Sequence, residues 1–200
     1  MIHVVLLGDS IFDNRSYVGG DPDVCSHLQA LAPPGTKVSL CAVDGSTTAN
    51  IPTQAASVPV TATHLVLSVG GNDALAYTHV LTPATGSVTN VLEYLGISVE
   101  EFGLRYRAAV QTLLTLQKPV LLCTIYNGNL PTEVAVAAKA AVSVFNDKIY
   151  QIANSYSLPV LELRRVCTES GDYANPIEPS SVGGRKIAIG ILKSVRQLDQ

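Results

Sequence analysis

Charged residues are scarce in this chain: they make up 14% of 200 residues, whereas hydrophobic residues make up 47%. The formal net charge is −3, and no basic stripe supplies the lysines and arginines that neutralise phosphates, so nucleic acid is not expected as a partner. High hydrophobic content with few charges is typical of a parallel sheet whose two faces are both covered by helices. The composition therefore favours an α/β fold.

Cysteine and histidine are also few, with four of each. The cysteines are Cys25, Cys41, Cys123 and Cys167, and the histidines are His3, His27, His64 and His79. No C-x-x-C pair is present, which predicts free buried thiols rather than disulfides or a redox centre. No pair of histidines has the spacing of zinc ligands. We therefore expect neither a metal nor another cofactor.

Long apolar runs are missing as well. None reaches membrane-spanning length, and Met1 leads almost directly into the first apolar run, without the features of a secretion signal. We therefore expect no membrane span and a cytoplasmic location. Nothing divides the chain into two cores, so we expect a single domain over residues 1–200. The oligomeric state is not predicted.

Five short apolar runs, each bounded by glycine, proline or polar residues, predict strands at 3–7, 37–42, 64–68, 120–124 and 159–162. Between them, the capping box Ser98-x-x-Glu101 predicts the start of a helix that continues to Leu116. A second helix follows Pro131 and runs to about Tyr156, and a last one begins near residues 180–183. This alternation predicts parallel strands in a three-layer α/β/α arrangement.

Polar sequences follow the first three predicted strands. They are Gly8-Asp9-Ser10, Val43-Asp44-Gly45-Ser46 and Gly70-Gly71-Asn72-Asp73. Because open parallel sheets bind ligands at the carboxyl ends of their strands, these sequences are candidates for one site. Taken singly, each has a simpler explanation: Ser10 as a helix cap, Gly45 as a turn residue and Asn72 as a loop amide. Their common position favours a site.

In this order the three sequences resemble the GDSL family of esterases and lipases, also called SGNH hydrolases, over nearly the whole chain. The resemblance implies a five-stranded parallel sheet ordered 2-1-3-4-5, flavodoxin-like in topology. It also implies that Ser10 is the nucleophile. The backbone N–H of Gly45 and the side-chain amide of Asn72 then stabilise the oxyanion with the N–H of Ser10. Asp9 and Asp73 are expected to brace their loops.

The C-terminal part departs from the family pattern. In place of Asp-x-x-His followed by Pro-Ser, the chain reads Asn175-Pro176-Ile177-Glu178-Pro179-Ser180. Glu178 is the only titratable residue there and is our candidate general base. His with Asp⁻ and Glu⁻ with Asn carry the same resting charge, and Asn175 could hold Glu178 through its amide. Burial would raise the pKa of Glu178 and a following helix N-terminus would lower it, so its direction stays open.

These residues predict a serine esterase that hydrolyses a small ester by acyl transfer through Ser10. Thioesters, acetyl sugars and short-chain esters all fit. An alternative is a ligand-binding protein on the same fold with little or no turnover, in which Glu178 is only a helix N-terminal acid. A nucleotide or flavin binder is disfavoured, because the first loop lacks a glycine-rich phosphate cradle.

Three further features stay open. His79, seven residues after Asn72, is either a substitute base or a surface histidine. Tyr126 either donates a hydrogen bond to substrate or only packs at the pocket rim. The stretch 74–97 is either a lid or a surface connection. With 13–23 and 126–130, it is expected to shape the pocket.

Overall fold

The computed structural model describes residues 1–77 and 87–198. At its centre lies a five-stranded sheet in the order β2-β1-β3-β4-β5, and all neighbouring strands pair in parallel. The strands are β1 (His3–Gly8), β2 (Lys37–Leu40), β3 (His64–Ser68), β4 (Val120–Cys123) and β5 (Val160–Leu161). Both the parallel sheet and its strand order are confirmed. The strands at the two edges are shorter than predicted: β2 ends at Leu40, and β5 has two residues.

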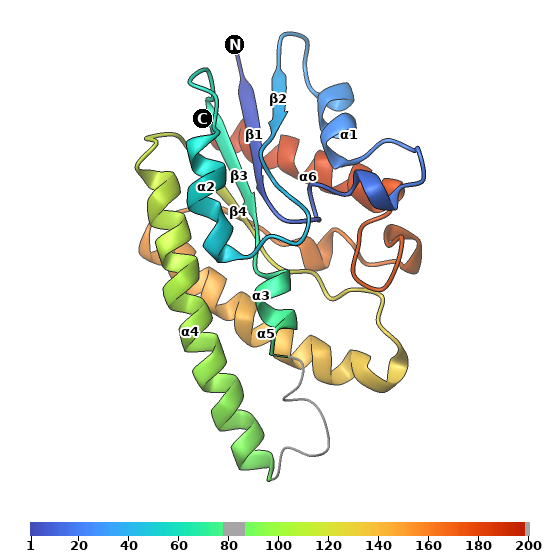
Figure 1. Cartoon of the computed structure of the whole chain (residues 1–200). Coiled ribbons are helices and arrows are strands. Elements are labelled where there is room, and N and C mark those ends of the chain that lie inside the picture. The colour runs from blue at the N-terminus through green and yellow to red at the C-terminus, as the bar shows by residue number, and fades with distance from the viewer. Residues whose placement is uncertain (78–86, 199–200) are drawn as a thin grey trace.

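Helices cover both faces of the sheet (Figure 1). One face is covered by α2, α4 and α5 and the other by α1 and α6, while α3 lies at the carboxyl edge. The helices are α1 (Val24–Leu31), α2 (Ile51–Ala56), α3 (Gly71–Leu75), α4 (Val88–Leu114), α5 (Thr132–Ser155) and α6 (Ser181–Leu198). Short 3-10 turns are η1 (Arg15–Tyr17), η2 (Thr48–Asn50), η5 (Leu163–Arg165) and η6 (Ser170–Asp172).

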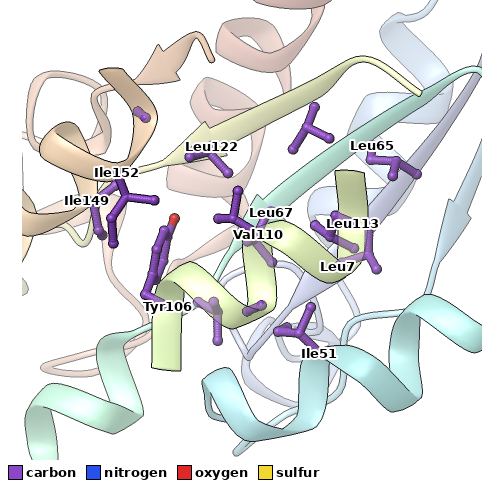
Figure 2. Packing of buried hydrophobic residues seen from close by; sticks show 14 of the residues in the cluster. Leu7, Ile51, Leu65, Leu67, Tyr106, Val110, Leu113, Leu122, Ile149 and Ile152 are labelled. Carbon is purple, nitrogen blue, oxygen red and sulfur yellow. The ribbon is translucent and has the colours of Figure 1, made fainter. Parts of the chain in front are cut away.

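Strand alternation divides the buried side chains between two clusters. Val5 and Leu7 of β1 point to the side of α2, α4 and α5, whereas Val4 and Leu6 point to the side of α1 and α6. Figure 2 shows the first cluster, in which Tyr106 of α4 lies close to strand and helix side chains. Every residue of β1 is buried, as the continuous apolar run predicts.

The predicted start of the long helix before β4 is wrong. α4 begins at Val88, and Ser87 caps it by accepting a hydrogen bond from the N–H of Asn90 at 3.3 Å. Ser98 lies inside the helix, where its hydroxyl donates to the carbonyl of Tyr94 at 2.8 Å. A serine can make this bond within a helix as readily as it caps one, so the Ser-x-x-Glu pattern marked the wrong boundary. The starts of α5 and α6 agree with prediction.

All four cysteines are free thiols, and Cys123 and Cys167 are buried. Among the described residues, no group of three His, Cys, Asp or Glu side chains is placed to hold a metal ion. No helix in the described ranges is long and apolar enough to cross a membrane.

Candidate active site

A glycine turn places Ser10 at the carboxyl edge of the sheet. Gly8, the last residue of β1, has φ +132°, and a Cβ there would lie 1.7 Å from the carbonyl oxygen of Ser68 on β3. Only glycine allows this approach. The N–H of Asp9 then donates to the same carbonyl at 3.1 Å, and the chain turns so that Ser10 is buried beside the sheet edge.

Ser10 contacts Glu178, a residue 168 positions later in the sequence. The Ser10 hydroxyl donates to Oε1 of Glu178 at 3.1 Å. Glu178 is only 6% exposed, and its other oxygen, Oε2, is buried and accepts no hydrogen bond from the described residues. A carboxylate that receives the proton of a hydroxyl at this distance is in reach to act as its base.

Burial raises the pKa of Glu178 above the usual glutamate value. The hydrogen bond from Ser10 opposes this shift, while the negative charge of Asp44 adds to it. The direction that the sequence left open is therefore upward: removal of the carboxylate from water outweighs the stabilising interactions. A raised pKa makes the carboxylate a better proton acceptor near neutral pH.

The loop that carries Glu178 is held by side chains from other elements. Tyr126, after β4, donates its hydroxyl to the carbonyl of Ile177 at 2.5 Å. Buried Asn14, after β1, donates its amide to the carbonyl of Pro179 at 3.1 Å. These two bonds anchor the residues on either side of Glu178 and thereby hold the backbone that carries its carboxylate.

Asn175 acts on Glu178 through the backbone. Its side-chain oxygen accepts from the N–H of Ile177 and from the N–H of Glu178, each at 2.9 Å. This is an Asx-type turn, in which a short amide side chain replaces a backbone acceptor. Among the described residues, no hydrogen bond joins Asn175 to the Glu178 carboxylate, and Asn175 is exposed.

A hydrogen bond joins the candidate oxyanion donor Asn72 to the residue that follows the other candidate, Gly45. The amide of Asn72 donates to the carbonyl of Ser46 at 2.9 Å, next to Gly45. Gly45 has φ +76° in a turn closed by the bond from the N–H of Ser46 to the carbonyl of Val43 at 3.1 Å. Asn72 lies with Ser10 and Glu178 on the wall of one cavity, whereas Gly45 does not line that cavity.

Gln54 was not singled out from the sequence, yet it joins two of the loops. This buried side chain of α2 accepts from the N–H of Gly8 at 2.8 Å and donates to the carbonyl of Gly8 at 2.8 Å. It also donates to the hydroxyl of Ser46 at 3.2 Å. Its only signal in the sequence is a polar residue beside Ile51 and Ala55 on the buried side of a short helix.

Asp9 and Asp73 brace the loops, as expected. Asp9 accepts from the N–H of Ile11 at 3.1 Å, and Asp73 accepts from the N–H and the hydroxyl of Thr48 at 3.0 and 2.6 Å. Arg105 of α4 lies 4.0 Å from the Asp73 carboxylate. Burial raises the pKa of Asp9 to about 7, partly opposed by the Ile11 bond.

A cavity of about 470 Å³ opens beside Ser10. Its walls come from α3, α4, α5 and the loop after β4, and most of the side chains that line it are apolar. Tyr126 lines the cavity but its hydroxyl is bound to Ile177, which leaves its predicted bond to substrate without support.

Two other predictions concern residues beyond Asn72. His79 lies outside the described residues. Of the stretch 74–97, residues 88–97 belong to α4, and Leu75, Val91 and Leu95 line the cavity. The predicted role in shaping the pocket therefore holds for the described part of this stretch and for 126–130, whereas the prediction for 13–23 is wrong, because none of its residues lines the cavity.

The sheet order and the serine at its carboxyl edge define the fold of the SGNH hydrolases. Residues 6–183 match the model of the GDSL-like lipase/acylhydrolase family, and the chain belongs to this family of carboxylic ester hydrolases. A search of curated proteins by sequence found no significant match.

Solved structures agree on the fold. A phospholipase A1 from Streptomyces albidoflavus superposes with a TM-score of 0.72 at 16% identity, over 98% of both chains. An acetyl xylan esterase gives 0.70 at 17% identity, over 97% of this chain and 100% of that one. An extracellular lipase from Streptomyces rimosus gives 0.66 at 16% identity, over 98% and 99%. At these identities the likeness concerns the fold alone.

Proposed function

We propose that the protein hydrolyses a carboxylic ester by acyl transfer through Ser10, with Glu178 as the general base. The observation that carries this proposal is the hydrogen bond from the Ser10 hydroxyl to the buried carboxylate of Glu178 at 3.1 Å. An alcohol is a poor nucleophile until a base accepts its proton, and Glu178 is in place to do so.

The reaction begins when Oγ of Ser10 attacks the ester carbonyl carbon and Oε1 of Glu178 takes the hydroxyl proton. The oxyanion accepts hydrogen bonds from the N–H groups of Ser10 and Gly45 and from the amide of Asn72. Collapse of the intermediate breaks the ester C–O bond, and the leaving alcohol takes the proton from Glu178. Water then attacks the acyl-serine while Glu178 accepts a proton from it, and Glu178 returns that proton to Oγ of Ser10 as the acyl C–Oγ bond breaks, which releases the carboxylic acid.

A glutamate suits this role because of its surroundings. Its raised pKa supports proton transfer near neutral pH, and Asn175 and Tyr126 orient its backbone. Asn175 is thus a positioning residue in this mechanism. Each oxyanion donor is expected to contribute about 3–4 kcal/mol to transition-state stabilisation.

The test is the pH dependence of kcat/KM for aryl ester hydrolysis by the wild type and variants. Ser10→Ala should abolish turnover, and Glu178→Gln should lower kcat about 10²–10⁴-fold. The acid limb in wild type should lie above the ordinary glutamate pKa of about 4.3. Glu93→Gln is the control: Glu93 is an exposed residue of α4, and its substitution should leave kcat unchanged.

Two outcomes would contradict the mechanism. If His79→Ala removed activity while Glu178→Gln kept it, the base would be the histidine. If a serine-directed organophosphonate left Ser10 unlabelled and no ester were cleaved, the protein would be a ligand-binding member of the family.

A further inference from the structure

The cavity beside Ser10 continues along one face of α5. Its wall there consists of Val134, Ala137, Ala138, Ala141, Val142 and Phe145, whose spacing places them on one side of the helix. The eleven residue steps from Val134 to Phe145 correspond to about 16 Å of helix. Phe145 and Val142 also pack against the core cluster, so this face leads from the core outward.

The position of α5 relative to Ser10 is fixed at the end of β4. Buried Asn146 accepts from the N–H of Ile125 and donates to its carbonyl, both at 2.7 Å. Phe145 is therefore level with the carboxyl edge of the sheet, where Ser10 lies. Ala141, Ala138 and Val134 follow at successive turns toward the helix N-terminus. Figure 1 shows that the first turns of α4 and α5 lie beyond the sheet edge on the side of α3.

The charges that line this groove are confined to its ends. Asp9 and Glu178 lie at the serine, and Glu133 lies in the first turn of α5. No lysine or arginine of the described residues lines it. Between the ends, the cavity is lined by alanines of α5, by Val91 and Leu95 of α4 and by Leu75 of α3. The best occupant of this middle part is uncharged and apolar, because most side chains there are apolar and offer few groups to replace the hydration of a polar one.

We propose that the groove along α5 binds an aliphatic acyl chain of the ester that Ser10 attacks, and that Ala138 and Ala141 keep it open. The inference rests on the proposed hydrolysis and names its substrate class: esters with acyl chains of several methylene groups, rather than the small esters expected from sequence. The continuity of the cavity with Ser10, Asn72 and Glu178 ties the groove to the reacting carbonyl.

Chain-length dependence follows from burial. Each methylene that leaves water on binding contributes about 0.8 kcal/mol, which corresponds to about fourfold in kcat/KM. The increase should continue with each added methylene until the groove is full and then level off. An occupant that ended at the serine would give no such increase.

The experiment measures kcat/KM for aryl esters from acetate to palmitate with the wild type, Ala138→Leu and Ala141→Leu. Each leucine adds bulk to the groove wall, so the ratio of long-chain to acetate kcat/KM should fall at least tenfold. Ala141→Leu should set a shorter limit than Ala138→Leu, because Ala141 lies nearer to the sheet edge. Ala140→Leu is the matched control, since this exposed alanine does not line the cavity and should keep the wild-type ratio.

The outcomes separate this inference from the proposed function. Ser10-dependent cleavage of acetate esters with no gain for longer chains, or equal ratios in Ala141→Leu and Ala140→Leu, would overturn the acyl groove and leave the esterase intact. If no ester is cleaved, calorimetric titration of decanol into Ser10→Ala decides the groove alone. Binding that Ala141→Leu weakens at least tenfold supports it, and no measurable binding overturns it.

Discussion

At the scale of residues, the environment of Glu178 determines what it can do. Its carboxylate is held among buried groups, and burial raises its pKa. The same burial that suits a base is unfavourable for folding, because a charged carboxylate loses hydration. Hydrogen bonds to the neighbouring backbone keep it in place without neutralising it.

Tyr126→Phe tests whether that positioning matters. The substitution removes the bond to the Ile177 carbonyl and keeps the edge-to-face packing of the ring on Tyr173. Loss of one such bond is expected to lower kcat about fivefold, with KM little changed, because the carboxylate is displaced relative to Ser10.

The control for this prediction is Tyr150→Phe, which removes a hydroxyl that donates to Glu162 at 3.0 Å and does not line the cavity. Steady-state kinetics of both variants supply the comparison. An equal fall in kcat for both, or a change confined to KM for Tyr126→Phe, would assign Tyr126 a structural or binding role instead.

At the scale of elements, the close contact between β1 and β3 at Gly8 builds the site. The strands approach so closely there that the Asp9 N–H reaches the Ser68 carbonyl and the next residue, Ser10, is left at the edge. Gln54 of α2 bonds both backbone groups of Gly8 and thereby links this turn to the loop that carries Gly45. The geometry of the serine is therefore a product of strand packing.

Gly8→Ala is expected to destabilise the fold by more than about 3 kcal/mol, because the new Cβ meets the Ser68 carbonyl in addition to the strain of positive φ. Gly20→Ala is the matched control: Gly20 has φ +100°, but nothing lies within 4 Å of its added Cβ. It should cost only about 1–2 kcal/mol. Urea unfolding of both variants measures the difference, and equal losses would show that the approach to Ser68 is not limiting.

At the scale of the whole molecule, Asp9 and Glu162 change the free energy of unfolding with pH in opposite directions. Burial, together with the charges of Glu178 and Asp73, raises the pKa of Asp9 to about 7. Burial also opposes ionisation of Glu162, but hydrogen bonds from Arg164 and Thr124 lower its pKa to about 2. Asp9 therefore favours the folded state when protonated, and Glu162 favours it when ionised.

The sign of each contribution follows from these directions. The contribution of Glu162 is complete above its unfolded pKa and is lost as pH falls toward 2. That of Asp9 is complete below its unfolded pKa and is lost as pH rises through about 7. The free energy of unfolding should therefore be highest at mildly acidic pH and decline by a few kcal/mol toward neutral pH.

Asp9→Asn tests the expected decline in the free energy of unfolding as pH rises toward neutral. An asparagine keeps an oxygen for the Ile11 N–H and cannot ionise, so the decline between about pH 4 and 7 should flatten. Urea unfolding at several pH values measures it, with Asp23→Asn as the control, since Asp23 accepts a similar capping bond from the N–H of Ser26. An unchanged slope in Asp9→Asn would place the responsible proton on another group.

Much of the fold and part of the site were determined by the sequence alone. The apolar runs at β1, β3 and β4 and the glycines that end or follow them are local signals, because a buried strand and a sharp turn each need particular residues at adjacent positions. The order of the Ser10, Gly45 and Asn72 motifs along the chain was equally visible. Boundaries were less certain, as Ser98 shows, because the same side chain can cap a helix or bond within one.

Only the tertiary structure decided that Glu178 meets Ser10 over a separation of 168 positions, that its pKa rises, and that Gln54, Asn14 and Tyr126 hold the loops together. It also decided that the alanine face of α5 opens onto a cavity. These features depend on which surfaces pack together and how much water they exclude. Desolvation and long-range contact are properties of the packed chain, and residue order does not record them.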